Sequence, residues 1–226
     1  MTDESHQSPD WEALRRTMVE KHLIARGIRD PRVLDVIGGL PRERFIPPEQ
    51  RQDAYADRAL PIACGQTISQ PYIVAYMTER LELTPTSRVL EIGTGCGYQT
   101  AVLAMLCANV YTIERIPALR RGAEDVLTRL GIANVRMACG DGSLGLPDFA
   151  PFDRIIVTAA APRVPSPLVE QLADTGILIA PVGGEKSQRI TCVERRAGRA
   201  IETSLLPCRF VRLIGREGWH PPKPDA

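Results

Sequence analysis

Three glycines at alternate positions, Gly93, Gly95 and Gly97, follow a short apolar run that contains a carboxylate, Glu91. The order strand, glycine turn and helix lets a ligand approach the backbone closely in α/β proteins. Glycine is needed in such a turn because a Cβ atom would block the approach and because some positions require a positive φ. Residues 89–97 therefore predict a ligand-binding turn.

The spacing and charge around this turn disfavour a pyrophosphate dinucleotide. The dinucleotide fingerprint is G-x-G-x-x-G, and Tyr98 stands where its third glycine would be. Glu91 would repel a phosphate but suits a cationic ligand such as a sulfonium. Glu114 ends the next predicted strand, 21 residues after Gly93, where a carboxylate accepts hydrogen bonds from ribose hydroxyls. A ligand with a ribose, a positive centre and no phosphate fits S-adenosylmethionine, whereas the alternative is a turn whose glycines serve only packing.

The overall composition predicts one globular domain, 1–226, for a chain of 226 residues with 24% charged residues. The net charge of +1 gives no reason to expect nucleic acid or a membrane as a partner. Eight basic but only two acidic residues fall between 186 and 216, which indicates either a solvated sheet face or a positive rim for a carboxylate substrate. With no N-terminal signal or long apolar segment, we expect a protein that is neither exported nor membrane-spanning.

Cysteine and histidine are poorly placed for metal binding or nucleophilic catalysis. The six cysteines are scattered and form no C-x-x-C pair, so we expect free thiols in a cytoplasmic protein. Histidine occurs only three times, and two of the three lie near the chain ends. A Ser-His-Asp hydrolase or a histidine metal site would need better-placed histidines, so we expect no metal.

The elements that must position the turn alternate between strand and helix patterns. Strands are predicted at 88–92, 109–113, 135–139, 153–158 and 176–182, and helices at 98–106, 117–130 and 165–173. This rhythm predicts an α/β fold with a doubly wound, mostly parallel sheet.

The two ends of the chain depart from this rhythm. Three further strands, at 188–195, 200–206 and 209–214, have no long helices between them and predict an antiparallel C-terminal edge. Residues 1–80 are expected to form N-terminal helices and loops that contain a substrate loop. Within the single domain they would precede the cofactor-binding core at 84–182 and the C-terminal strands at 188–215.

A second polar cluster, Gly65-Gln66-Thr67-Ile68-Ser69-Gln70-Pro71, lies before the glycine turn. Ser69 precedes an amphipathic helix and could serve simply as its N-cap, which is worth about 1 kcal/mol. The run from Gln66 to Gln70 is also rich in hydrogen-bond donors that would orient a second substrate. The spacing of these residues leaves both interpretations open.

Several segments occur together in an order that resembles bacterial protein-L-isoaspartate O-methyltransferases, from about residue 12 to 215. These segments are Arg44-Phe45-Ile46, Ala59-Leu60-Pro61-Ile62, 65–71, 89–98, 110–115, Gly140-Asp141-Gly142, Phe152-Asp153 and Pro181-Val182-Gly183. The glycine turn is shared by many methyltransferases, whereas the Gln-Thr-Ile-Ser-Gln-Pro run is specific to this family. Two residues depart from the family pattern. Cys64 stands where the family usually has a small or polar residue, and Arg212 replaces the usual proline. Both put the substrate range in question rather than the reaction.

The resemblance implies a Rossmann-like methyltransferase fold and a role for each matched residue. Ser69 corresponds to the family's active-site serine. The implied S-adenosylmethionine site consists of Thr67, Ser69, Glu91, Gly93, Thr94, Gly95, Gly97, Glu114, Asp141 and Gly142. The implied substrate-binding residues are Gln66, Ile68, Val211 and Arg212. The implied partners are isoaspartyl peptides and proteins, and neither a metal, nor nucleic acid, nor a membrane is expected. The protein is expected to be a cytoplasmic monomer.

The implied reaction is methyl transfer to the α-carboxylate of an isoaspartyl residue, a step in protein repair. A carboxylate of pKa about 3.5 is already ionised at neutral pH, so no general base is required. Transfer from a sulfonium is an in-line displacement that depends on proximity and orientation, so Ser69 would aim the carboxylate rather than attack it.

The sequence leaves other functions open as alternatives. A methyltransferase for another carboxylate or small molecule would share the cofactor residues. A nucleic-acid base methyltransferase is disfavoured because 158–162 reads Thr-Ala-Ala-Ala-Pro instead of an Asp/Asn-Pro-Pro-Tyr/Phe cluster. A non-enzymatic binding module would be expected to lack some of the ligand contacts, whereas every expected position is filled. A nicotinamide-dependent oxidoreductase is disfavoured by the glycine spacing.

Overall fold

A computed structural model describes residues 9–220, and its centre is a seven-stranded sheet in the order β5-β4-β3-β6-β7-β8-β9. The strands are β3 (Arg88–Ile92), β4 (Asn109–Glu114), β5 (Val135–Cys139), β6 (Phe152–Val157), β7 (Leu172–Gly183), β8 (Gln188–Arg196) and β9 (Arg199–Cys208). The pairs from β5 to β7 are parallel, whereas β8 and β9 pair antiparallel at one edge. The predicted doubly wound α/β fold with an antiparallel C-terminal edge is confirmed.

The helices lie before the sheet and between its parallel strands. They are α1 (Trp11–Met18), α2 (Pro31–Gly39), α3 (Pro71–Arg80), α4 (Tyr98–Ala104), α5 (Pro117–Arg129) and α6 (Ser166–Glu170). A π-helix, Val19–Leu23, continues α1, and short 3-10 helices occupy Ile24–Arg26, Arg42–Phe45, Pro48–Asp53, Ala63–Gly65, Gly142–Leu144 and Pro147–Phe149. Local sequence explains several starts, because Asp30 caps α2 through the Arg32 amide and prolines occupy the first turns of α2, α3 and α5.

Side chains on neighbouring residues of the central strands point to opposite faces of the sheet. Val89 and Val110 belong to the core shared with α1 to α5, whereas Leu90 and Tyr111 belong to the core on the face covered by α6. This alternation is the two-residue period of a strand. Because both faces are covered, β3 and β4 are almost continuously buried, including the polar residues Glu91, Thr112 and Glu114.

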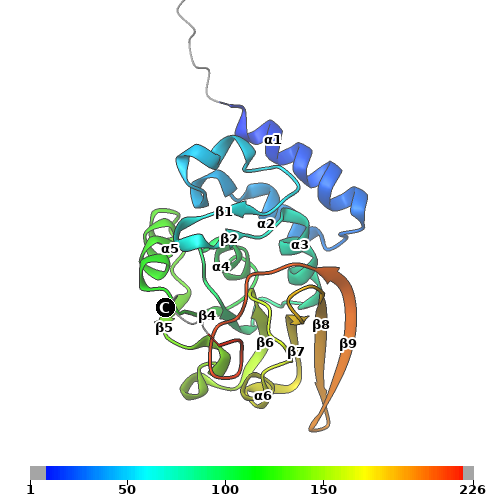
Figure 1. Ribbon diagram of the computed structural model, residues 1–226. Helices are drawn as coiled ribbons and strands as arrows, with labels where there is room; N and C mark the ends of the chain where they lie inside the picture. Colours follow the sequence, from blue (N-terminus) through cyan, green and yellow to red (C-terminus); the bar gives the residue numbers. More distant parts are fainter. Residues whose placement is uncertain (1–8, 221–226) are drawn as a thin grey trace, which may run out of the picture.

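The N-terminal portion lies across the end of the sheet at which the parallel strands finish (Figure 1). It includes a two-stranded antiparallel sheet of β1 (Leu60–Pro61) and β2 (Thr67–Ile68). On the far edge, β8 and β9 form a long hairpin remote from β5 and α5 (Figure 1). Of the helices within 9–220, none has both the length and the apolar character needed to cross a bilayer.

Two predicted elements in the second half of the chain differ from the structure, since one helix is shorter than predicted and one strand is absent. The helix expected at 165–173 is the short α6, because β7 already begins at Leu172, which pairs with Phe152. The strand expected at 209–214 is absent, and only isolated bridges, such as Ala160 to Arg212, involve this segment. Instead of extending the sheet, the segment crosses its end, where the Ala160 amide donates to the Val211 carbonyl at 2.7 Å.

Candidate active site

The glycine turn after β3 has the backbone conformation that its composition predicts. Gly93, Gly95 and Gly97 have φ angles of 96°, 56° and 89°, a region that favours glycine. A Cβ atom on Gly93 would lie 2.4 Å from the Oγ1 atom of Thr158. Beside Gly95, in contrast, the nearest atom to such a Cβ would be 3.9 Å away. The turn is therefore packed tightly underneath and open on the side that faces the cavity.

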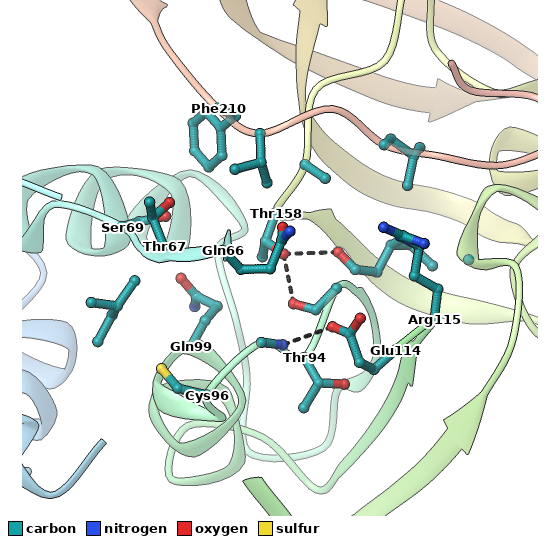
Figure 2. A pocket seen from close by; sticks show the side chains of 18 of the residues that line it. Gln66, Thr67, Ser69, Thr94, Cys96, Gln99, Glu114, Arg115, Thr158 and Phe210 are labelled. Atoms are coloured by element: carbon teal, nitrogen blue, oxygen red, sulfur yellow. Dashed lines mark hydrogen bonds between the residues drawn. The ribbon is translucent and has the colours of Figure 1, made fainter. Parts of the chain in front are cut away.

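A cavity that is open to solvent lies above this turn. Its lining consists of 66–69, 92–96, 113–116 and 210–214, with Ile73, Val74, Met77, Tyr98, Gln99, Gly142, Thr158 and Ala159. We call 92–96 and 113–116 the turn wall, and 66–69 and 210–214 the loop wall. Figure 2 shows Glu114 and Arg115 on the side of the turn wall, and Thr67, Ser69 and Phe210 on the side of the loop wall.

Glu114 stands at the end of β4 with its carboxylate tied to the turn. Its side-chain oxygens accept hydrogen bonds from the amides of Gly95 and Ile116, both at 3.0 Å. The residue is only 6% exposed but lines the cavity. A carboxylate has about four acceptor positions, so Glu114 retains capacity for hydroxyl groups of a bound ligand.

Glu91 lies behind the turn and not in the cavity lining, contrary to the expectation that it faces a ligand. Its Oε2 atom accepts hydrogen bonds from Thr100 at 2.5 Å and Thr112 at 2.7 Å, and Thr112 in turn accepts from Thr94. Its Oε1 atom is buried and has no hydrogen-bond partner among the described residues. Burial raises the pKa of Glu91 to about 8, although the two threonine hydrogen bonds oppose this rise. Glu91 therefore supports the turn through a threonine network.

Asp141 and Gly142 follow β5, and only the glycine reaches the cavity lining. The Asp141 carboxylate accepts from the amide and hydroxyl of Ser143 and from the amide of Arg216, at 2.7 to 2.9 Å. A Cβ atom on Gly142 would lie 2.6 Å from Cγ2 of Ile92. Asp141 therefore fixes the conformation of the loop, and Gly142 allows the loop backbone to pack closely against Ile92. Gly97 likewise lies outside the lining.

The polar loop at 66–70 is held mainly through backbone groups and amide side chains. Ile68 pairs with Leu60 in the two-stranded sheet, and the Gln70 amide donates to the Asp57 carbonyl at 2.9 Å. The N-cap of α3 is Gln70, with no side-chain capping bond. The simple interpretation of Ser69 as a helix cap is therefore wrong. Its hydroxyl makes no hydrogen bond within 9–220, and the residue lines the cavity together with Gln66, Thr67 and Ile68.

The segment at 210–214 closes the loop wall from the other side. The Phe210 amide donates to the side chain of Gln188 at 2.7 Å. Val211 and Arg212 both line the cavity, as expected of substrate-binding residues. The Arg212 guanidinium lies 2.8 Å from a Glu185 carboxylate oxygen and 5.5 Å from the ring centroid of Trp219. Arg212 therefore stands at the cavity rim in a partly exposed ion pair.

Several lining residues were not predicted as site residues, among them Gln99, Thr158, Arg115 and Phe210. Gln99 is in the first turn of α4, and its amide donates to Thr78 at 3.0 Å. Thr158 follows β6 and donates to the Gly93 carbonyl at 2.6 Å, as Figure 2 shows. Arg115 and Phe210 adjoin residues that were predicted. The end of each parallel strand is the signal that points to Thr158 and Arg115, whereas the position of Gln99 depends on helix packing.

The chemistry of the lining suits binding and orientation rather than acid–base catalysis. The lining combines apolar side chains from α3, such as Val74 and Met77, with hydroxyl and amide groups from other segments. Its acidic group is the buried carboxylate of Glu114. Burial raises the pKa of the Cys96 thiol to about 11, so this lining cysteine remains protonated at neutral pH. The described chain from 9 to 220 contains no cluster of three His, Cys, Asp or Glu residues suited to a metal ion.

Comparisons with known proteins agree with this geometry. A family model described as "Protein-L-isoaspartate(D-aspartate) O-methyltransferase (PCMT)" matches residues 14–218. The chain is 54% identical over 205 residues to the protein-L-isoaspartate O-methyltransferase of Methanoregula boonei, covering 91% of this chain and 94% of the relative.

Solved structures extend the similarity to the fold. One protein-L-isoaspartate O-methyltransferase structure shares 29% identity and a TM-score of 0.80, over 90% of this chain and 67% of that one. The PCMT of Plasmodium falciparum, solved in complex with S-adenosyl-L-homocysteine, shares 27% identity and a TM-score of 0.79, over 88% of this chain and 98% of that one.

Proposed function

The chain belongs to the protein-L-isoaspartate O-methyltransferase family, and from that premise we propose how its cavity carries out the reaction. The enzyme transfers a methyl group from S-adenosyl-L-methionine to the α-carboxyl group of L-isoaspartyl residues, which serves protein repair. The observation that carries our proposal is the free hydroxyl of Ser69, which lies across one cavity from the glycine turn. We assign the turn wall to the methyl donor and the loop wall to the peptide.

The turn wall fits the donor in shape and in hydrogen-bonding capacity. The open side of Gly95 leaves room for a close approach, whereas Gly93 and Gly142 let the backbone pack against Thr158 and Ile92, where a Cβ atom would clash. The remaining acceptor positions of Glu114 suit ribose hydroxyls. When bound, the donor supplies a sulfonium-activated methyl group, and this wall holds it in a fixed orientation.

Of four further residues predicted for the donor site, two line the cavity and two shape the backbone behind it. Thr67 lines the cavity on the loop wall and offers a hydroxyl to the donor from that side. Thr94 lines the turn itself and is held through Thr112. Gly97 and Asp141 lie outside the lining, so they act by shaping the backbone at the start of α4 and after β5.

The loop wall is assigned to the acceptor peptide. Ser69 donates its free hydroxyl to the isoaspartyl carboxylate and aims one oxygen at the methyl group, while Gln66 adds an amide donor on the same wall. Ile68 and Val211 contribute apolar surface, and Arg212 attracts acidic flanking residues from the rim. Orientation is the main contribution of these residues, because the acceptor carboxylate is already ionised and needs no general base.

We also propose that the enzyme is a monomeric, single-domain protein, 1–226, of the cytoplasm. All six cysteines are free, as suits a reducing compartment. The mass of the active species in solution, measured by light scattering during chromatography, tests the monomer, and a dimer would contradict it.

The decisive experiment compares labelled methyl transfer to paired peptides that differ only in aspartyl or isoaspartyl linkage. We expect transfer to the isoaspartyl peptide alone, and S69A should lower kcat about tenfold while leaving the melting temperature unchanged, as expected for loss of one charge-assisted hydrogen bond. S187A, an exposed serine between β7 and β8, is the matched control. An unchanged kcat in S69A would refute the role of Ser69, and equal labelling of both peptides would refute the assignment of the loop wall to isoaspartate recognition.

A further inference from the structure

A buried arginine outside the cavity lining contacts both sides of the site. Arg42, in the 3-10 helix Arg42–Phe45, is 0% exposed and is among the largest fully buried side chains of the protein. An arginine side chain remains charged even in such surroundings. A buried charge is costly unless hydrogen bonds replace the lost water, so the partners of Arg42 indicate its task.

The guanidinium of Arg42 bridges two backbone carbonyl groups and no carboxylate within the described residues. Its Nε atom donates to the Ala54 carbonyl at 2.8 Å, and its Nη2 atom donates to the Ser69 carbonyl at 2.7 Å. The bond to Ser69 fixes the backbone of the residue whose hydroxyl faces the cavity. No side chain caps the N-terminus of α3, which follows Ser69. Among the described residues, the side chain that hydrogen-bonds to the Ser69 backbone is therefore that of Arg42.

The same guanidinium lies against a residue that begins the helix after the glycine turn. The Cζ atom of Arg42 is 4.7 Å from the ring centroid of Tyr98, which lines the cavity. The ring of Phe45 packs edge-on against Tyr98, with centroids 5.3 Å apart. Both Nη1 of Arg42 and the hydroxyl of Tyr98 are buried without a hydrogen-bond partner among the described residues. Arg42 therefore connects Ser69 of the loop wall with the first residue of α4.

We propose that Arg42 is a positioning residue for methyl transfer, which holds the Ser69 backbone at a fixed distance from the helix that follows the glycine turn. The inference rests on the proposed role of Ser69 and extends it to a side chain that touches neither donor nor acceptor. Only the forked guanidinium reaches Ala54, Ser69 and Tyr98 together. A lysine keeps the charge but places it at one point, so it cannot hold the three groups at once.

The test measures kcat, the peptide KM and the dissociation constant of S-adenosylhomocysteine for R42K, S69A and the double variant. R88K is the matched control, because Arg88 also donates to two carbonyls, those of Phe149 and Pro151, and stacks on Tyr111, but lies at the opposite end of β3. We expect R42K to lower kcat by up to about tenfold, no more than S69A does, with KM and the dissociation constant changed less than about threefold. The double variant should be no slower than S69A, since both changes remove the same oriented hydroxyl.

Each outcome bears on one of the two proposals. An unchanged kcat in S69A would refute the role of Ser69, and with it the basis for Arg42. A slow S69A combined with a normal R42K, or losses that multiply in the double variant, would overturn the inference on Arg42 alone. R88K should keep the wild-type kcat even where its melting temperature falls. If R42K does not fold at the assay temperature, R42Q is measured at a lower temperature against the same criteria.

Discussion

The two walls of the cavity are held in place by different means. On the turn wall, backbone amides of Gly95 and Ile116 bind a nearly buried carboxylate, and a threonine network around Glu91 supports the turn from behind. On the loop wall, the Ser69 hydroxyl makes no hydrogen bond within 9–220. The loop is anchored through the Ser69 carbonyl, which accepts from Arg42, and through the Gln70 side chain, which donates to the Asp57 carbonyl.

This difference matches the two tasks of a methyltransferase. The methyl donor is the same molecule in every turnover, so a wall with tightly packed backbone and buried charge suits it. The acceptor is a segment of many different damaged proteins, so a wall that presents free hydroxyl and amide groups from an anchored backbone suits it. Substitutions should therefore affect the turn wall severely and the loop wall mildly.

The largest expected effect comes from G93A on the turn wall. Gly93 has a φ of 96°, and a Cβ atom there would lie 2.4 Å from Thr158. Backbone strain and displacement of Thr158 should weaken binding of S-adenosylhomocysteine about 100-fold, measured by calorimetry. G122A is the control, because nothing lies within 4 Å of the corresponding position in α5, and alanine in a helix should stabilise the protein by about 0.5–1 kcal/mol. Normal binding by G93A would contradict a rigid turn wall.

A smaller loss is expected for E114Q, also on the turn wall. The amide that replaces one oxygen cannot accept a hydrogen bond from a backbone N–H, so one of the bonds to Gly95 or Ile116 is lost. We expect the dissociation constant of S-adenosylhomocysteine to rise about 10- to 100-fold, as for a hydrogen bond to a charged group. E124Q, whose exposed ion pair with Arg120 contributes little, should bind normally. Equal affinity in E114Q and the wild type would remove Glu114 from the donor site.

The support behind the turn wall should give the protein a characteristic pH dependence. The pKa of Glu91 is raised from 4.5 to about 8, mainly by burial. Between these values the folded protein holds a proton that the unfolded chain has released, so this contribution to stability is complete below the unfolded pKa and is lost as pH rises towards 8. The free energy of unfolding should therefore fall by about 2 kcal/mol between about pH 6 and pH 8.

Urea denaturation of the wild type and of E91Q at several pH values checks this dependence. Glutamine mimics the protonated carboxyl group, keeps an oxygen for Thr100 and Thr112, and does not titrate. The fall in the free energy of unfolding between pH 6 and pH 8 should be about 2 kcal/mol smaller in E91Q, because the whole Glu91 contribution is absent. Parallel curves for the two proteins would show that Glu91 is ionised in the folded state throughout this range.

The smallest effect is expected on the loop wall, at Arg212. The ion pair with Glu185 is partly exposed, with side-chain exposures of 46% and 57%, so it contributes little to stability. R212A should raise KM for isoaspartyl peptides with acidic flanks about twofold, and E185Q, which frees the guanidinium, should lower it. Peptides with neutral flanks serve as the control. A KM that does not respond to either variant would remove Arg212 from substrate binding.

Much of the architecture was predictable because it depends on local patterns. Alternating apolar strands and helix periods predicted the parallel core, and Gly93, Gly95 and Glu114 marked the end of the sheet at which the cavity lies. Residues 209–214 escaped this logic, since their apolar pattern is typical of a strand but their amides and carbonyls bond to the loop after β6. Gln99 and Arg42 were also missed, because their positions depend on how α4 and the N-terminal portion pack together.

Sequence alone predicted the main parts of the turn wall, because a strand, a glycine turn and a carboxylate at the next strand end are local features whose geometry follows from backbone conformation. Tertiary structure decided the rest. It moved Glu91 from the expected ligand contact to a buried support, and it excluded Ser69 as a helix cap. It also connected Ser69 to Arg42, 27 residues earlier in the chain. The physical reason is that burial and hydrogen-bond partners depend on contacts between distant segments, which no local pattern specifies.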